Sequence, residues 1–118
     1  EKSSGVDKVI HAVEAYQLPA PDFRAGHRRT IVTIFGPRPF EGMGRDDRVR
    51  ACYQHCALRW VISERMTNRS LRERFRLSEG KAAIVSQVIA ATIDAGLVRP
   101  DKGVGGSRRF ARYVPFWA

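Results

Sequence analysis

Long apolar runs are missing from this sequence, and so are the features of an exported protein. No stretch approaches the ~18 consecutive apolar residues that a membrane-spanning helix needs. The amino terminus has neither an initiator Met nor the apolar core of a signal peptide. No segment combines a basic face with a large apolar face, as membrane-surface helices do. We therefore expect a cytoplasmic fragment with no membrane partner.

Cysteine is scarce, because only Cys52 and Cys56 occur. Their spacing of four residues places them on one face of a helix with Val49 and Trp60, so we expect both thiols to be reduced and buried. His55 lies between them but projects from a different face. Structural zinc usually takes four ligands from paired short spacings, and no second pair follows. The sequence therefore predicts no metal site.

Catalytic motifs are also missing. A phosphate-binding loop that ends at Gly80-Lys81 would need a glycine where Phe75 stands. It would also need Ser or Thr where Ala82 stands. The three histidines are scattered, and no Ser/His/Asp or paired-carboxylate arrangement follows from their spacing. We expect no enzyme activity and no cofactor in this fragment.

Positive charge is abundant and unevenly placed. The chain carries 21 Lys and Arg against 12 Asp and Glu, a net charge of +9. Residues 1–44 hold six basic and five acidic residues, whereas residues 45–118 hold fifteen and seven. Such an excess attracts polyanions, with nucleic acid first among them. Ordinary solubility charge is the alternative explanation.

Residues 1–44 have the pattern of an incomplete unit. Apolar residues at helical spacing predict a helix over residues 6–16, and the run 30–35 predicts one strand of a hairpin. A helix and two strands bury too little apolar surface to stand alone. We therefore expect the carboxy-terminal remnant of a larger α+β domain, whose last part, residues 36–44, is a turn-rich linker.

Residues 45–118 carry the patterns of three helices and two strands. Asp46 can cap the first helix, with Asp47 in its first turn, and Thr67 or Asn68 can cap a brief second helix. The segment Arg76-Leu77 then makes a tight turn.

A third helix is predicted from Ser78 to Ala95, with Gly96 placed for a left-handed cap. Four apolar residues at helical spacing form its inward stripe, namely Ala82, Val85, Ile89 and Ile93. Strands at 97–99 and 110–114 flank a basic, glycine-rich loop. This is the order of a winged helix-turn-helix. The predicted fold class is therefore mainly α with small β, a winged helix-turn-helix preceded by a short α+β fragment.

In such a fold the third helix enters the major groove of DNA and the wing contacts phosphates. The predicted outer surface of this helix presents Gly80, Lys81, Ile84, Gln87 and Ala91. Only Gln87 offers the bidentate amide that suits adenine, and Lys81 is long enough to reach a guanine or a phosphate. We expect direct readout of the base sequence to be modest.

Phosphate contacts are better supplied than base contacts. The arginines around the second helix are Arg69, Arg72, Arg74 and Arg76, and the wing carries Lys102, Arg108 and Arg109. The alternative for individual arginines is ion pairing with Glu73 or Glu79 on a solvated helix face. The predicted DNA-binding residues are Arg69, Arg72, Arg76, Lys81, Ile84, Gln87, Lys102, Arg108 and Arg109.

Four stretches of the chain resemble one family. They are FGPRPF (35–40), DRVRACYQHC (47–56), MTN with SLRERF (66–75), and the ending ARYVPFWA (111–118). The chain resembles the carboxy terminus of bacterial transcriptional regulators that are often labelled RecG-related ATP-dependent DNA helicases. The resemblance covers most of the chain, although no helicase motif occurs in it.

The resemblance implies more than the residues do by themselves. It implies an upstream schlafen-like, AlbA-type DNA-binding domain and a histidine-kinase-like ATPase region, of which residues 5–35 are the closing helix and strand pair. The nucleotide-binding motifs would lie upstream of Glu1. One departure from helix-turn-helix proteins is Arg76, where Gly or Asn often takes a left-handed conformation that Arg adopts only with strain.

Two functions remain open at this point. The first is a DNA-binding domain of a transcriptional regulator, with duplex DNA and the upstream domains of the same protein as partners. The second is a protein-interaction or dimerisation module, such as a homodimer, because Ile84 and Ala91 would make an exposed third helix apolar. A covered third helix would favour interaction, and a free one beside basic side chains would favour DNA.

Overall fold

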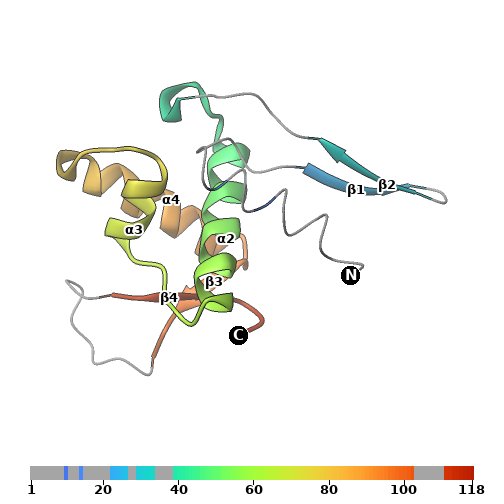
Figure 1. Ribbon diagram of the computed structural model, residues 1–118. Coiled ribbons are helices and arrows are strands. Elements are labelled where there is room, and N and C mark those ends of the chain that lie inside the picture. The colour runs from blue at the N-terminus through green and yellow to red at the C-terminus, as the bar shows by residue number, and fades with distance from the viewer. Residues whose placement is uncertain (1–9, 11–13, 15–21, 27–28, 34–38, 103–110) are drawn as a thin grey trace.

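The protein is described by a computed structural model that places residues 10, 14, 22–26, 29–33, 39–102 and 111–118. Within these residues the fold is mainly helical, with two small antiparallel two-stranded sheets (Figure 1). This confirms the predicted class of a mainly α protein with small β. No helix among these residues has the length and apolar character to cross a membrane.

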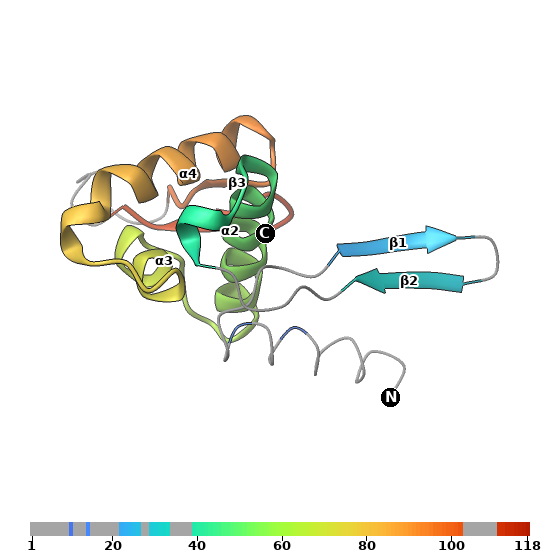
Figure 2. The ribbon, with the colours of Figure 1, turned by 90° about the horizontal axis from the view of Figure 1, so that it is seen from above.

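The amino-terminal sheet is a hairpin. Strand β1 (Asp22–Gly26) pairs antiparallel with β2 (Arg29–Thr33), and Phe23 stands opposite Val32 in the register. Figures 1 and 2 both show this hairpin extending away from the helices. The predicted strand pair is therefore confirmed. The predicted helix over residues 6–16 lies almost entirely outside the described residues.

The first long helix, α2 (Arg45–Val61), follows a 3-10 turn, η1 (Phe40–Gly42). Its N-cap is Gly44 in an extended conformation, so the prediction that Asp46 caps this helix is wrong. The helix begins one residue before Asp46. Both Asp46 and Asp47 therefore lie in the first turn, where the helix dipole favours acidic side chains.

The core of the helical unit includes part of the predicted linker. Phe40 and Met43 are both buried and belong to the same apolar cluster as α2 and α4. The ring of Phe40 packs 4.8 Å from the ring of Phe75, centroid to centroid. The guanidinium of Arg48 covers Phe40 and donates a hydrogen bond to its carbonyl oxygen. Packing therefore fixes the approach of the chain to α2.

The second and third helices are joined by a short turn. Helix α3 (Asn68–Arg74) is capped by Thr67, whose hydroxyl accepts from the backbone of Ser70 in a reciprocal capping box. Arg76 has a φ of 55°, the left-handed conformation that the turn requires. A 3-10 turn, η2 (Glu79–Lys81), then leads directly into α4 (Ala82–Asp94).

The chain leaves α4 through Gly96, whose φ of 76° confirms the predicted left-handed cap. Strand β3 (Val98–Pro100) then pairs antiparallel with β4 (Tyr113–Pro115). Met66 adds an isolated bridge to Tyr113, so the link between α2 and α3 also joins this small sheet. Both predicted strands exist: β3 has the predicted three residues but begins one position later, and β4 begins at Tyr113 and ends one residue beyond the predicted 110–114.

Candidate nucleic-acid interface

Helix α4 buries one face and exposes the other. It packs against α2 and α3 through four buried residues, Val85, Val88, Ile89 and Thr92. The opposite, outer face presents small and polar side chains that are all exposed, namely Ala83, Gln87, Ala90 and Asp94. This face can offer one amide and one carboxylate to a partner.

The outer face differs in part from the predicted one. Gln87 and Ile84 are exposed as expected, Ile84 at 36%, but Ala91 is half-buried. The reason is that Val88 and Thr92 are buried, so the buried face of α4 is rotated about the helix axis relative to the predicted stripe. Ala82 and Ile93, placed in that stripe, are half-buried. The apolarity of Val88 was the sequence signal for this orientation.

Basic side chains surround the amino-terminal end of α4. Lys81 is exposed immediately before the helix, and Arg76 is exposed in the preceding turn. On α3, the side chain of Arg69 is 80% exposed and lies 3.9 Å from the carboxylate of Glu73. Arg72 is half-buried, and its Nε donates to Asn68 Oδ1 at 2.8 Å. Three of the predicted phosphate-binding residues are thus accessible, and Arg72 is partly engaged within α3.

Asn68 fixes α3 against α4. Its Nδ2 atom donates to the carbonyl oxygen of Ala82 and to Ser86 Oγ, each at 2.9 Å. Its Oδ1 atom accepts from Arg72 within α3, so the amide nitrogen bonds to α4 while the amide oxygen bonds to its own helix. This contact sets the position of the amino-terminal end of α4 relative to the basic residues of α3. Nothing in the sequence spacing singled out Asn68 for this role.

Arg74 does not belong to the exposed basic cluster in which the sequence placed it. Its side chain is 3% exposed, and its Nε lies 3.0 Å from Glu14 Oε2. Glu14 also accepts from Gln54 at 3.2 Å and lies 3.3 Å from His55 Nδ1. Arg74 is therefore a structural cation that neutralises a buried carboxylate, and it is not accessible to phosphate.

The same cluster places Ser70, His55 and Glu14 in the order of a hydrolytic triad. His55 Nε2 is 3.0 Å from Ser70 Oγ, and its other ring nitrogen faces Glu14. However, Ser70 is only 6% exposed. Its hydroxyl already bonds to both the backbone nitrogen and the carbonyl oxygen of Thr67. A serine held in this way has no access to a substrate, so the cluster is structural.

The Glu14 carboxyl is charged in this environment. Burial alone would raise its pKa, but the hydrogen bond from His55 and the charge of Arg74 outweigh burial and lower the pKa below its usual 4.5. Glu14, 41 positions before His55, thereby ties the amino-terminal segment to α2 and α3.

Cys52 and Cys56 lie in the core, as predicted. Both are buried with free thiols, and Cys52 Sγ is 3.9 Å from Met66 Sδ. Burial raises the pKa of each thiol to about 12. Among the residues that the structure describes, no three His, Cys, Asp or Glu side chains gather as a metal site requires. Metal content itself stays a prediction.

The predicted wing is described only at its base. Lys102 is exposed at the end of the described segment, whereas Arg108 and Arg109 lie outside the described residues. The antiparallel pairing of β3 and β4 joins the two sides of this loop.

Comparison of the chain with protein-family models, with curated proteins and with solved structures finds no match.

Proposed function

We propose that residues 45–118 form a winged helix-turn-helix domain that binds duplex DNA as the DNA-binding end of a transcriptional regulator. The observation that carries this proposal is the outer face of α4, which is exposed along its length. Basic side chains flank its amino-terminal end. The order of three helices and an antiparallel strand pair supports the same reading.

The distribution of charge along α4 indicates which end of the helix faces DNA in the proposed complex. Lys81 stands at the amino-terminal end, and Asp94 stands exposed at the carboxy-terminal end. Phosphates would be attracted to the first and repelled from the second. The amino-terminal half of α4 therefore enters the major groove, as recognition helices do, and Gln87 is the side chain placed to contact a base.

The remaining contacts would be to phosphates. Arg69 and Arg76 bind the backbone beside the groove, and Lys102, Arg108 and Arg109 bind it from the wing. Such contacts give affinity that depends on salt but carry little sequence information. By the family resemblance, this domain would act together with upstream domains of the same protein.

A protein-interaction module is the competing function, and the exposed face of α4 argues against it. Ala91 is half-buried, so of the two apolar residues that motivated this alternative only Ile84 is exposed. Gln87, Asp94 and two alanines make up the outer face instead. Protein interfaces usually present several large aromatic or aliphatic anchors, whereas Ile84 is the only large apolar side chain exposed on α4.

The test is a fluorescence-anisotropy titration against random duplex DNA at several salt concentrations. We expect the logarithm of the association constant to fall linearly with the logarithm of salt. The double variant Arg69→Gln/Lys81→Gln should reduce the magnitude of that slope by about 0.9 for each lost phosphate contact.

The matched control is Arg99→Gln, which removes one positive charge at β3. The Arg99 guanidinium bonds to the carbonyl of Ala118, and Arg99 is not among the predicted DNA-binding residues. We expect this variant to keep the parental slope. No binding to duplex at low salt, or equal losses for control and double variant, would contradict DNA binding by this face.

A further inference from the structure

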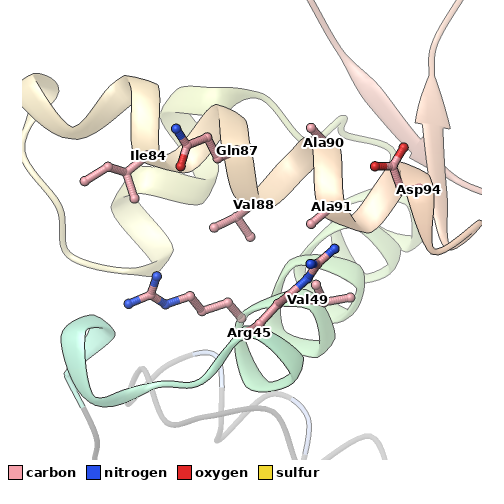
Figure 3. A pocket seen from close by; sticks show the side chains of 9 residues that line it. Arg45, Val49, Ile84, Gln87, Val88, Ala90, Ala91 and Asp94 are labelled. Carbon is pink, nitrogen blue, oxygen red and sulfur yellow. The ribbon is translucent and has the colours of Figure 1, made fainter.

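A groove lies between the first two turns of α2 and the side of α4. Its volume is about 440 Å³, within the range of small-molecule sites. Val49, Val88 and Ala91 supply apolar lining, while Arg45, Arg48 and Gln87 supply polar groups. Figure 3 shows Arg45 on the α2 side of the groove and Gln87 on α4 across from it. The groove thus combines an apolar surface with polar groups from both helices.

Arg48 is held in place before any ligand arrives. Its guanidinium carbon lies 3.7 Å from the centre of the Phe40 ring, and one terminal nitrogen donates to the Phe40 carbonyl oxygen at 2.9 Å. Its Nε atom is buried and makes no hydrogen bond to any described residue.

The charges of the lining select the ligand. Two arginines stand against one acidic residue, Asp94, so the groove favours a single negative charge. Guanidinium groups pair best with planar carboxylates. The apolar lining favours a ring or a short hydrocarbon chain on the same molecule.

We propose that this groove binds a small amphipathic carboxylate, with its carboxylate at Arg45 and Arg48 and its apolar body against Val88 and Ala91. Gln87 and Ile84 line the groove and also belong to the predicted DNA-contacting set. A bound ligand therefore covers part of the surface that would enter DNA. Competition between ligand and DNA rests on the proposed function, whereas binding of the ligand does not.

The experiment is a calorimetric and NMR titration of the full chain with 1-naphthoate. The neutral analogue 1-naphthalenemethanol tests the need for the carboxylate, and inorganic phosphate tests whether charge alone suffices. The variant Arg45→Gln removes an exposed lining arginine, and Arg99→Gln is the control because Arg99 is exposed on β3 and does not line the groove.

We expect saturable binding of 1-naphthoate, with the largest amide shifts at residues 84–91. The parent should bind the neutral analogue and phosphate at least about tenfold more weakly than 1-naphthoate, because a charge-assisted bidentate contact or the apolar contact is lost. The Arg45→Gln variant should bind 1-naphthoate at least about tenfold more weakly than the parent does. The Arg99→Gln variant should bind as the parent does. No saturable binding, equal binding of the neutral analogue, or equal losses in both variants would overturn the proposal.

A last measurement separates this site from the proposed function. Addition of 1-naphthoate to a DNA complex should release DNA from the parent and much less from Arg45→Gln. If 1-naphthoate binds but duplex DNA never does, the groove stands and DNA binding fails. If 1-naphthoate binds without releasing bound DNA, the ligand site stands and the competition is wrong.

Discussion

Two thiols at the centre of the core show how burial controls residue chemistry. Cys52 and Cys56 are free and buried, and burial raises the pKa of each to about 12. The thiolate is the reactive form, so neither residue should react at neutral pH while the chain is folded. We expect iodoacetamide to label neither cysteine in the native protein and both in guanidinium chloride. Rapid labelling of the native protein would contradict this, and stoichiometric zinc in the purified protein would contradict the absence of metal.

Among the described residues, Glu14 and Arg74 form the most buried ion pair. The two residues lie far apart in the sequence. Removing one partner of such a pair leaves an uncompensated charge, which costs about 3 kcal/mol or more. We therefore expect Arg74→Met to lower the free energy of unfolding by about that amount in urea denaturation. The double variant Glu14→Gln/Arg74→Met should lose clearly less than the sum of the single variants, because the two residues are coupled. Additive losses would contradict the pairing.

The same pair makes stability depend on pH in one direction. The pKa of Glu14 is lower in the folded protein than its usual 4.5, so the folded state holds its proton less tightly than the unfolded state. The stabilisation is therefore fully present above pH 4.5 and is lost as the pH falls through the folded pKa. The parent should lose stability over this acid range more steeply than Glu14→Gln. Parallel pH profiles for the two proteins would argue against a lowered pKa.

At the scale of elements, the turn between α3 and α4 depends on Arg76. Its φ of 55° is costly for any residue with a Cβ atom, whereas glycine adopts it freely. We expect Arg76→Gly to be more stable than Arg76→Ala by about 1 kcal/mol in chemical denaturation. The control is Arg72, inside α3, where the order should reverse because glycine weakens a helix by roughly 0.5–1 kcal/mol relative to alanine. Alanine more stable than glycine at both positions would contradict a left-handed Arg76.

Local patterns predicted the elements well. The cap at Thr67, the left-handed Gly96 and the burial of Val85 and Ile89 all follow from neighbours within a few positions, and all are confirmed. The start of α2 was missed because Gly44 ends the preceding extended segment and lets the helix begin before Asp46. Helical boundaries depend on such backbone details more than on the presence of a capping side chain.

Contacts between distant residues could not be predicted in this way. His55 meets Glu14 and Ser70 only because α2, α3 and Glu14 come together in the folded chain. The sequence placed Arg74 with Arg69 and Arg72 in one basic cluster around α3. The contact with Glu14 buries Arg74 instead. The groove beside α4 likewise requires α2 and η1 to hold Arg48 in position. Each of these features depends on packing between elements, about which a helical pattern says nothing.

For the whole molecule, we propose that the wing contacts DNA phosphates while α4 contacts the bases. Replacing both Arg108 and Arg109 with alanine should change folding stability little, typically within about 0.5 kcal/mol per exposed site. Affinity for unrelated duplexes should fall by similar factors, and the salt slope should shrink by about 0.9 for each lost contact. These two residues lie outside the described part of the chain, so this expectation rests on the sequence.

Gln87→Ala is the complementary variant, because Gln87 is exposed on the outer face of α4 and carries the only amide there. If it reads a base, its loss should weaken preferred sites by roughly 1 to 3 kcal/mol while leaving binding to random duplex nearly unchanged. Preferred sites can be selected from a random library with the parent. The affinity of the Gln87→Ala variant and of the Arg108/Arg109 variant for these sites can then be measured by anisotropy. Loss of affinity for random and selected duplexes alike would make Gln87 a positioning contact.

Unchanged affinity and salt slope in the Arg108/Arg109 variant would remove the wing from the interface, and the protein-interaction function would then become the better proposal.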